Sequence, residues 1–432
     1  MSASSFPDAK SGLSVAMLSL HTSPLDRPGT GDAGGMNVYL KGVAGALARR
    51  GVRVELFTRA ASQGQAAART VELTPGVRVH RLTAGPLERL PKESIGPEVI
   101  EEFAQAVMNQ PPTSLVHSHY WLSGLAGEQV AKAWQANHIQ SLHTVAVLKN
   151  RNLALGDQPE GDHRVAAEAG LANRATRVVA VSPAEAHAIE NDLGVASEKI
   201  TVVMPGVDSS VCCPGEPGHL VGLPSALKRP QGYALMAGRI QPIKGQDLAI
   251  RAIAAIDPEH RPALLISGVP SGSHHDFASS LRRLAIDLGV DNDVVFLGAV
   301  AMDRLAGLMR GAVVTLMPSH SETYGLVALE SAACGTPVVA YNTTGLRFSV
   351  ADQVSGVLVD SREPADWAKV ITDLALNRQR RQALSEGGIK IGRRSSWDSA
   401  GGGLWQVYQD LLDGAAMGRD AASLAIAPSG CC

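Results

Sequence analysis

The chain has 432 residues, of which 45% are hydrophobic and 19% are charged, and this length predicts two large domains. The 39 basic and 41 acidic residues nearly cancel, so charge favours neither nucleic acid nor a membrane surface as a partner. Five cysteines, in two adjacent pairs and a singleton, do not form a disulfide framework. No apolar run has the length of a signal peptide or a membrane span, so we expect a cytoplasmic protein without stable membrane insertion. Its assembly could be homodimeric.

Strands and helices are predicted to alternate through the first half of the chain. Short apolar runs predict strands over 13–20, 52–58, 77–82, 114–119, 139–144 and 177–182. Helical periodicity predicts helices over 38–50, 97–109, 123–136 and 164–175. Strands that alternate with helices predict a parallel, doubly wound sheet.

A segment rich in Pro, Gly and Ser, residues 205–216, reads as an interdomain linker. A second series of strands is predicted over 233–238, 263–268, 293–298, 313–318, 337–341 and 356–360. We therefore expect an α/β chain with two Rossmann-like, doubly wound domains, 13–208 and 215–396, that face a cleft. A helix over 397–412 would cross back to the first domain, and the tails 1–12 and 414–432 are expected to be disordered.

The segment PGTGDAGGMNVY contains Gly29, Gly31 and Gly34 at the G-x-G-x-x-G spacing of dinucleotide-binding proteins. An NAD-dependent oxidoreductase is therefore one alternative. However, the predicted strand ends at Leu20, and residues 21–28 make the turn too long for a pyrophosphate site. The acidic residue that should meet the ribose, Glu55, also falls in the middle of a strand. We interpret the segment as a loop whose glycines let the backbone approach another ligand.

In the second half, GRIQPIKG (238–245) places Arg239 after a strand and Lys244 on a turn stiffened by Pro242. Two cations at the carboxyl end of a strand can hold a diphosphate, Arg through its forked guanidinium and Lys as a point charge. An ordinary solvated basic turn is the other interpretation of this segment.

The stretch SETYGLVALE predicts a loop followed by a helix that Gly325 opens. Glu322 lies in the loop and Glu330 in the second turn of the helix. The free N–H groups at the helix start can bind phosphate, and a carboxylate there can accept hydrogen bonds from the vicinal hydroxyls of a ribose. In isolation, the same pattern would also fit a Glu322 that only caps the helix and a Glu330 that is exposed to solvent.

Together, the Gly-Arg-x4-Lys turn and the Glu-x7-Glu helix resemble the second domain of retaining, nucleotide-sugar-dependent glycosyltransferases with two facing Rossmann domains, the GT-B type. The resemblance implies that Arg239 and Lys244 clamp the diphosphate of the donor and that Glu330 holds its ribose. It also implies that Glu322 contacts the donor sugar and that Val300 presents backbone atoms to the uracil.

Three first-domain motifs resemble the D-inositol-3-phosphate glycosyltransferases of mycothiol synthesis: residues 21–40, HSHYWLSG (117–124) and HTVAVLKN (143–150). The similarity covers about residues 13–410. It implies transfer of N-acetylglucosamine from UDP-GlcNAc to 1D-myo-inositol 3-phosphate with retention of the anomeric configuration.

The same resemblance implies that Lys92, Tyr120, Thr144 and Arg164 hold the acceptor phosphate, since two cations and two hydroxyl-bearing side chains suit a phosphomonoester dianion. The other implied acceptor contacts are His21, Asp32, Ala33, Gly34, Gly35, Met36 and Asn37. The other implied donor contacts are Arg27, Pro28 and Gly35.

The implied catalytic residues are Arg239, Lys244, Glu322, His119 and His143. The two histidines end strands on the cleft side, where they either lie near the donor sugar or have a structural role.

The chemistry requires no metal or other cofactor. A structural Mg²⁺ bound through backbone atoms would fall at Met309, Arg310, Ala312 and Thr336. His274 and His275 lack a set of metal-ligand partners and are expected at the surface.

The chain departs from the family pattern in the loop 343–350, and also at His320 and Tyr324. This loop should lie near the donor sugar, so the identity of the donor stays open, and another UDP-hexose is an alternative. Another phosphorylated acceptor is also an alternative. A nucleotide-sugar-binding module without turnover is a further alternative.

Overall fold

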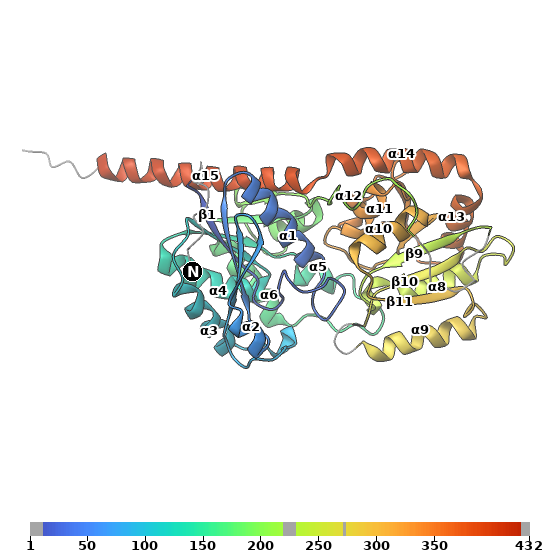
Figure 1. Ribbon diagram of the computed structural model, residues 1–432, viewed down its shortest axis with the longest axis horizontal. Coiled ribbons are helices and arrows are strands. Elements are labelled where there is room, and N and C mark those ends of the chain that lie inside the picture. The colour runs from blue at the N-terminus through green and yellow to red at the C-terminus, as the bar shows by residue number, and fades with distance from the viewer. Residues whose placement is uncertain (1–11, 219–229, 271–273, 425–432) are drawn as a thin grey trace, which may run out of the picture.

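The computed structural model describes residues 12–218, 230–270 and 274–424, which form two α/β domains side by side (Figure 1). The first domain is built on a sheet with the strand order β3-β4-β2-β1-β5-β6-β7-β8. Its strands are β1 (Ser14–Leu18), β2 (Arg53–Arg59), β3 (Thr70–Thr74), β4 (Val77–Leu82), β5 (Leu115–His119), β6 (Asn137–Ser141), β7 (Arg177–Ala180) and β8 (Ile200–Val202).

The central strand β1 shows why the apolar runs predicted this sheet. All five of its residues are buried, as expected where helices cover both faces of a parallel sheet. Neighbouring strands run parallel except at one edge, where β3 pairs antiparallel with β4. Neither β3 nor β8 was predicted, because β3 lies half-exposed at the edge and β8 has only three residues. A purely parallel sheet was therefore a wrong prediction for the β3 edge.

The connections between the first-domain strands supply the helices. These are α1 (Gly35–Arg49), α2 (Gln63–Ala67), η1 (Lys92–Ser94), α3 (Pro97–Met108), α4 (Trp121–Trp134), α5 (Ala146–Asn150), α6 (Asp162–Arg174), α7 (Pro183–Asn191) and η2 (Ser197–Lys199).

The second sheet has the order β11-β10-β9-β12-β13-β14, the doubly wound order in which the strands fan out from a central switch point. Its strands are β9 (Tyr233–Ala237), β10 (Ala263–Ser267), β11 (Val294–Gly298), β12 (Val314–Met317), β13 (Val338–Tyr341) and β14 (Gly356–Val359). Its helices are η4 (Pro242–Lys244), α8 (Gln246–Ala254), α9 (His275–Asp287), α10 (Met302–Gly311), α11 (Leu326–Ala333), α12 (Leu346–Ser349), α13 (Pro364–Leu376) and α14 (Arg378–Arg394). The two sheets confirm the predicted α/β fold class, and the boundaries 13–208 and 215–396 stay predictions.

The last helix, α15 (Trp397–Leu424), leaves the second domain and runs along the first (Figure 1). The predicted crossing helix 397–412 is therefore present but longer than expected. Disorder from residue 414 was a wrong prediction as far as Leu424, because the helix continues through this stretch. The predicted disorder of 1–11 and 425–432 lies outside the described residues.

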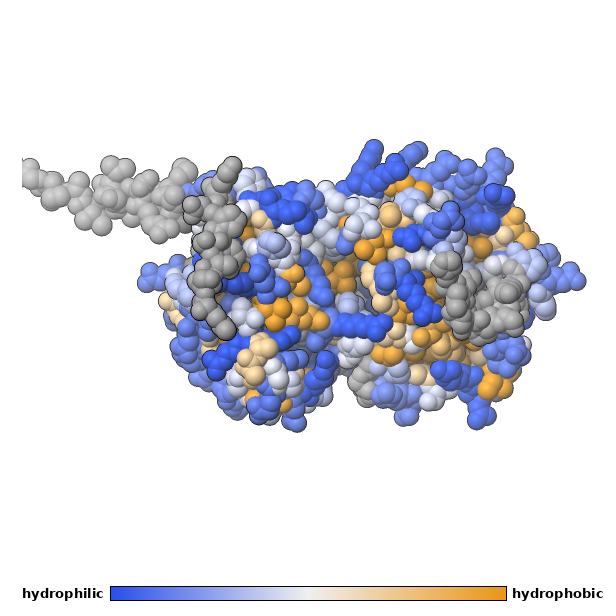
Figure 2. All heavy atoms as spheres, viewed as in Figure 1, coloured by the Kyte–Doolittle hydropathy of each residue, from blue (hydrophilic) through white to orange (hydrophobic). Residues whose placement is uncertain are grey.

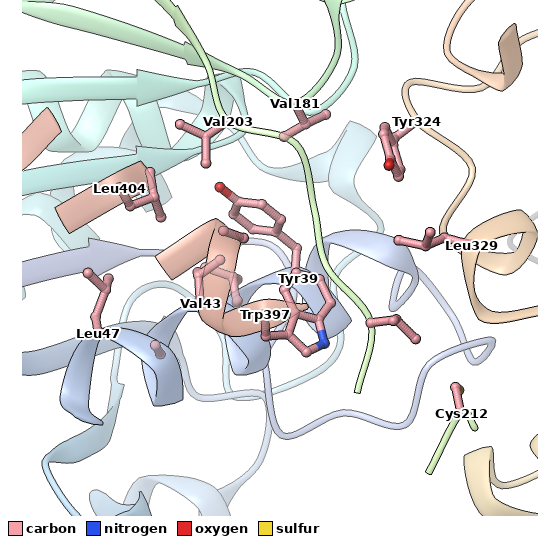
Figure 3. Packing of buried hydrophobic residues seen from close by; sticks show 14 of the residues in the cluster. Tyr39, Val43, Leu47, Val181, Val203, Cys212, Tyr324, Leu329, Trp397 and Leu404 are labelled. Atoms are coloured by element: carbon pink, nitrogen blue, oxygen red, sulfur yellow. The ribbon is translucent and has the colours of Figure 1, made fainter. Parts of the chain in front are cut away.

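A hydrophobic core continues from the first domain into the second. Figure 3 shows Tyr39 of α1 beside Trp397 and Leu404 of α15, with Tyr324 and Leu329 of the second domain in the same cluster. On the outside, hydrophilic side chains cover much of both domains, and hydrophobic residues show in separate groups (Figure 2). Among the residues described, no helix is both long and apolar enough to cross a membrane.

Candidate functional site

A cleft of about 450 Å³ lies between the two domains, lined by loops from both. The loops follow the carboxyl ends of parallel strands, which is where ligands bind in doubly wound sheets. Most predicted site residues line this cleft. They are His21, Arg27, Pro28, Asp32, Gly34, Gly35, Met36, Lys92, Tyr120, His143, Thr144, Arg164, Arg239, Lys244, Val300, Glu322 and Glu330.

The turn after β9 places two cations on the second-domain wall of the cleft. Arg239 follows the strand directly, and Lys244 ends the short helix η4. The Lys244 Nζ atom lies 2.6 Å from the Oε1 atom of Glu322, which also accepts a hydrogen bond of 3.0 Å from Ser319. Burial lowers the pKa of Arg239, but an arginine this basic stays a cation at neutral pH. The wall therefore carries two positive charges, and one of them already has a carboxylate partner.

Helix α11 begins on the same wall. Gly325 is its N-cap residue and adopts the left-handed conformation, with φ of 95°. A side chain at this position would also meet Leu346 at 2.7 Å, so only glycine fits. Five residues further on, Glu330 is buried, and this burial raises the pKa of its carboxyl to about 7. The helix start and Glu330 thus present backbone N–H groups and a carboxyl to one end of the cleft, as the sequence predicted.

The glycine-rich loop of the first domain approaches this wall closely. A Cβ atom on Gly34 would lie 3.8 Å from Arg239 Nε, and one on Gly35 would lie 3.4 Å from the side chain of Leu326. The loop is held by Asn37, which accepts a hydrogen bond of 2.9 Å from the N–H of Gly34. The glycines therefore bring first-domain backbone up to the cations, and the segment is no dinucleotide turn.

A second group of cations lies on the first-domain wall. Arg164 is 3% exposed, and its guanidinium carbon lies 4.9 Å from the ring centre of Tyr120. The same guanidinium donates a hydrogen bond of 3.2 Å to the carbonyl of Thr144. The ring of His21 packs 4.5 Å from that of Tyr120. Burial, followed by the nearby charge of Lys92, lowers the pKa of His21 to about 3. The predicted phosphate-binding residues thus lie together.

Three histidines cluster at this wall: His117 and His119 are fully buried, and His143 is partly buried. His119 Nδ1 and His143 Nε2 are 2.9 Å apart, and the ring of His117 packs 4.2 Å from that of His119. His143 lines the cleft, whereas His119 does not. Burial lowers the pKa of His143 to about 3, so its imidazole is neutral at physiological pH. His143 can therefore hydrogen bond a ligand, while His119 positions it.

Two predicted residues of the glycine-rich loop, Asn37 and Ala33, do not line the cleft. Asn37 is fully buried, and its amide donates to the Thr22 hydroxyl at 2.8 Å and to the Ser23 carbonyl at 2.6 Å. Direct contact of Asn37 with the acceptor was therefore a wrong prediction, because its hydrogen-bonding groups hold the loop instead. Ala33 is likewise buried.

The residues predicted for magnesium lie away from the cleft, at the end of α10. The Met309 carbonyl accepts a hydrogen bond from the Thr336 hydroxyl, and Arg310 donates to the carbonyls of Val211 and Cys213. Within the described residues, no group of three His, Cys, Asp or Glu side chains could hold a metal ion. The Met309 carbonyl is thus already hydrogen-bonded within the protein. A structural Mg²⁺ at backbone atoms here stays a prediction, and no step below uses one.

The loop that departs from the family pattern supports Glu322. The Thr344 hydroxyl accepts a hydrogen bond of 2.9 Å from the Glu322 N–H and donates one of 2.8 Å to its carbonyl. The Thr343 hydroxyl donates to the His320 carbonyl at 3.0 Å. Two threonine side chains thus fix the backbone that carries the Glu322 carboxylate.

Sequence reasoning missed several residues of the cleft, among them Lys149, Glu160 and His274. His274 was expected at the surface, but it is partly buried and lines the cleft. A signal for Glu160 was present, since Glu160, Arg164 and Glu168 are spaced four residues apart and so share one side of a helix.

The comparisons with known proteins agree with this geometry. Residues 34–206 match the glycosyl transferase 4-like domain, and residues 224–391 match the glycosyl transferases group 1 model. The chain is 42% identical to a D-inositol 3-phosphate glycosyltransferase from Acidothermus cellulolyticus, over 92% of this chain and 90% of that protein. It is 41% identical to a protein of the same name from Saccharomonospora viridis, over 92% and 94% of the two chains.

Solved structures extend the likeness to the fold. The chain matches sucrose-phosphate synthase from Thermosynechococcus elongatus with a TM-score of 0.83 and 26% identity, over 93% of this chain and all of that one. It matches the Anabaena protein HepE, solved with UDP and glucose, with a TM-score of 0.71 and 20% identity, over 92% and 100% of the two chains. The chain therefore belongs to the glycosyltransferase family that contains the D-inositol 3-phosphate glycosyltransferases, and it has the GT-B fold.

Proposed function

We propose that this glycosyltransferase moves N-acetylglucosamine from UDP-GlcNAc to 1D-myo-inositol 3-phosphate and retains the anomeric configuration. The observation that carries the proposal is that one cleft has two separate cationic walls. Arg239 and Lys244 line the second-domain wall, and Lys92 and Arg164 line the first-domain wall. One wall suits the diphosphate of a donor, and the other suits the phosphomonoester of an acceptor.

The donor would lie along the second-domain wall. Its diphosphate would meet Arg239, Lys244 and the N–H groups at the start of α11. The ribose hydroxyls would donate hydrogen bonds to Glu330, whose carboxyl lines this end of the cleft. The uracil would lie against the loop of Val300, which Arg27 of the first domain reaches through a hydrogen bond of 3.0 Å to the Ala299 carbonyl.

The acceptor would lie on the first-domain wall, with its phosphate near Lys92, Tyr120 and Arg164. Its ring hydroxyls would then face the glycine-rich loop and His21. Closely placed groups of this kind convert a reaction between two molecules into one within a single complex, which is a large part of the rate enhancement.

The transfer breaks the bond between the anomeric carbon and the diphosphate oxygen and forms a bond from that carbon to an inositol hydroxyl. The hydroxyl proton passes to the leaving diphosphate oxygen on the same face of the sugar. Arg239 and Lys244 stabilise the negative charge that develops there. Glu322 is bonded to Lys244 and Ser319, which suits it to position the lysine rather than to attack the sugar. His143 is neutral and serves as a hydrogen-bonding group.

The oxidoreductase alternative has less support. Strand β1 ends at Leu18, and residues 19–28 separate it from Gly29, whereas a dinucleotide turn is tight. Glu55 lies within β2, and its carboxylate is bonded to Arg78 at 3.1 Å and His80 at 2.6 Å. Neither feature can therefore meet a dinucleotide at the end of the strand.

A panel of donors and acceptors, read by release of UDP, tests the proposal. We expect the fastest release from UDP-GlcNAc with inositol 3-phosphate and little release with unphosphorylated inositol. A faster rate with UDP-glucose would reassign the donor and would trace to the loop 343–350. Thermal protection by NAD but not by UDP would contradict the proposal as a whole.

A further inference from the structure

A carboxylate already occupies the cation group of the first-domain wall. Glu160 Oε2 lies 2.9 Å from Arg164 Nη1, and Glu160 Oε1 is bonded to Lys149 Nζ. Glu160, Lys149 and Arg164 all line the cleft. Partial burial opposes ionisation, but the charge of Arg164 and the hydrogen bond from Lys149 lower the pKa of Glu160 to about 2. The site therefore holds an internal anion between two cations.

The backbone of Glu160 is anchored independently of its side chain. Its N–H donates to the Asn150 side chain at 2.8 Å, and its carbonyl accepts from the same side chain at 3.0 Å. The carboxylate can therefore change rotamer while the loop between α5 and α6 keeps its course. The Glu160 side chain is 18% exposed and the Lys149 side chain 26%, so both have room to move.

Arg164 has a second carboxylate partner, Glu168, whose position is fixed. Glu168 Oε1 accepts a hydrogen bond of 2.7 Å from Arg164 Nε, and its other oxygen accepts one of 2.7 Å from the Ala146 N–H. The Glu168 side chain is fully buried. Arg164 thus keeps one fixed partner if Glu160 leaves, and its outer nitrogen then becomes free for another anion.

We propose that the Glu160 carboxylate neutralises Arg164 and Lys149 until a phosphomonoester binds and displaces it, with Lys149 as an additional phosphate ligand. The inference rests on the proposed function for the identity of the acceptor. The exchange replaces one carboxylate by a phosphate dianion, so the cations are never left unpaired. Because the product carries the same phosphate, the returning carboxylate also speeds product release.

The test is whether loss of the Glu160 carboxylate strengthens or weakens the binding of a phosphate. Calorimetry measures the affinity, first for inorganic phosphate and then for inositol 3-phosphate. Glu160→Gln removes the competing charge and keeps the shape of the side chain. We expect it to bind both anions about fivefold more tightly than the wild type. Glu160→Ala, which also lacks the charge, should shift the affinity in the same direction. Weaker or unchanged binding in both variants would overturn the proposal, since a residue that merely orients Arg164 would weaken binding when lost.

Two controls separate the inference from general effects. Glu128→Gln removes a carboxylate that pairs with Arg174 at the far end of α6, and it should leave the phosphate affinity unchanged. Lys149→Ala should weaken phosphate binding several-fold, and no effect would remove Lys149 from the site.

In turnover, Glu160→Gln should lower the KM for inositol 3-phosphate and lower kcat through slow product release. Binding of inorganic phosphate needs no turnover, so the affinity result stands even if the proposed acceptor is wrong. Conversely, turnover with inositol 3-phosphate and no gain in phosphate affinity would refute only the role of Glu160.

Discussion

Lys244 is the residue whose charge the proposed chemistry needs most. Its Nζ atom reaches the cleft and pairs with Glu322 at 2.6 Å. Lys244→Ala should lower kcat by about 10²–10³-fold, because a preorganised cation no longer stabilises the leaving diphosphate. The rate of UDP release measures this, and the melting temperature shows whether the fold is intact.

The matched control is Lys369→Ala on α13, which removes an exposed lysine that pairs with Asp366 at 3.1 Å, away from the cleft. It should leave both the rate and the melting temperature unchanged. An unimpaired rate in Lys244→Ala would refute its catalytic role.

Glu330 should make stability depend on pH. Burial raises the pKa of this carboxyl to about 7 from an ordinary 4.5. Between these values the unfolded chain is ionised and the folded chain is protonated, so the free energy of unfolding falls as pH rises towards 7. The total cost is about 3 kcal/mol, reached above pH 7.

Glu330→Gln lacks this proton equilibrium. The difference in melting temperature, variant minus wild type, should therefore be larger at pH 8 than at pH 5. An equal difference at both pH values would contradict the raised pKa. The same variant should also bind UDP more weakly, because an amide is a poorer acceptor for ribose hydroxyls.

Residue types and spacing predicted much of the site. Arg239, Lys244, Glu322 and Glu330 come from two short motifs whose chemistry is local, and the cleft does contain them. The spacing of Glu160 and Arg164 is also a local signal, but the contact of Glu160 with Lys149 could not be found in this way. This contact depends on how the loop between α5 and α6 folds back, which no local pattern specifies.

At the scale of elements, the packing of α1 against α15 sets a size limit. A Cβ atom on Gly42 would lie only 2.1 Å from the ring of Trp397. Gly42→Ala should therefore cost about 1–3 kcal/mol by overpacking, despite the better helix propensity of alanine. The melting temperature should fall.

Gly45, one turn further along the same helix, is the control. A Cβ atom there would meet the end of the flexible Arg49 side chain at 3.6 Å and the Thr74 methyl group at 3.9 Å, both ordinary contact distances. Gly45→Ala should be neutral or stabilise the protein by up to about 1 kcal/mol. If both substitutions had the same effect, the contact between α1 and α15 would not be the cause.

Elements with strong apolar periodicity were predicted well, and weak ones were not. Strand β1 is buried throughout and reads as an apolar run, whereas β3 is a half-exposed edge strand of mixed composition. The end of α15 was missed for another reason. Its last turns have small residues and no apolar stripe, so nothing in the local pattern distinguishes them from a tail.

At the scale of the whole molecule, direct contacts join the two domains across the cleft. The Thr323 hydroxyl donates a hydrogen bond of 2.5 Å to the carbonyl of His143. This contact couples the loop of Glu322 to the wall that would hold the acceptor. Thr323→Val keeps the shape but removes the donor, so the closed arrangement should be less populated.

We expect Thr323→Val to raise hydrolysis of the donor relative to transfer by about five- to tenfold, since water gains access to an open cleft. Free N-acetylglucosamine and glycosylated product, measured in the same reaction, give this ratio. Thr323→Ser should behave like the wild type. A ratio that is unchanged in the valine variant would show that the contact does not govern closure.

The central claim is that both cationic walls act on one transfer between two bound substrates. The most direct test is the NMR spectrum of the product formed from UDP-GlcNAc and inositol 3-phosphate. The account predicts one new anomeric signal with the α configuration of the donor, formed in equal amount to the UDP released. A β signal, or UDP release with only free N-acetylglucosamine, would contradict it.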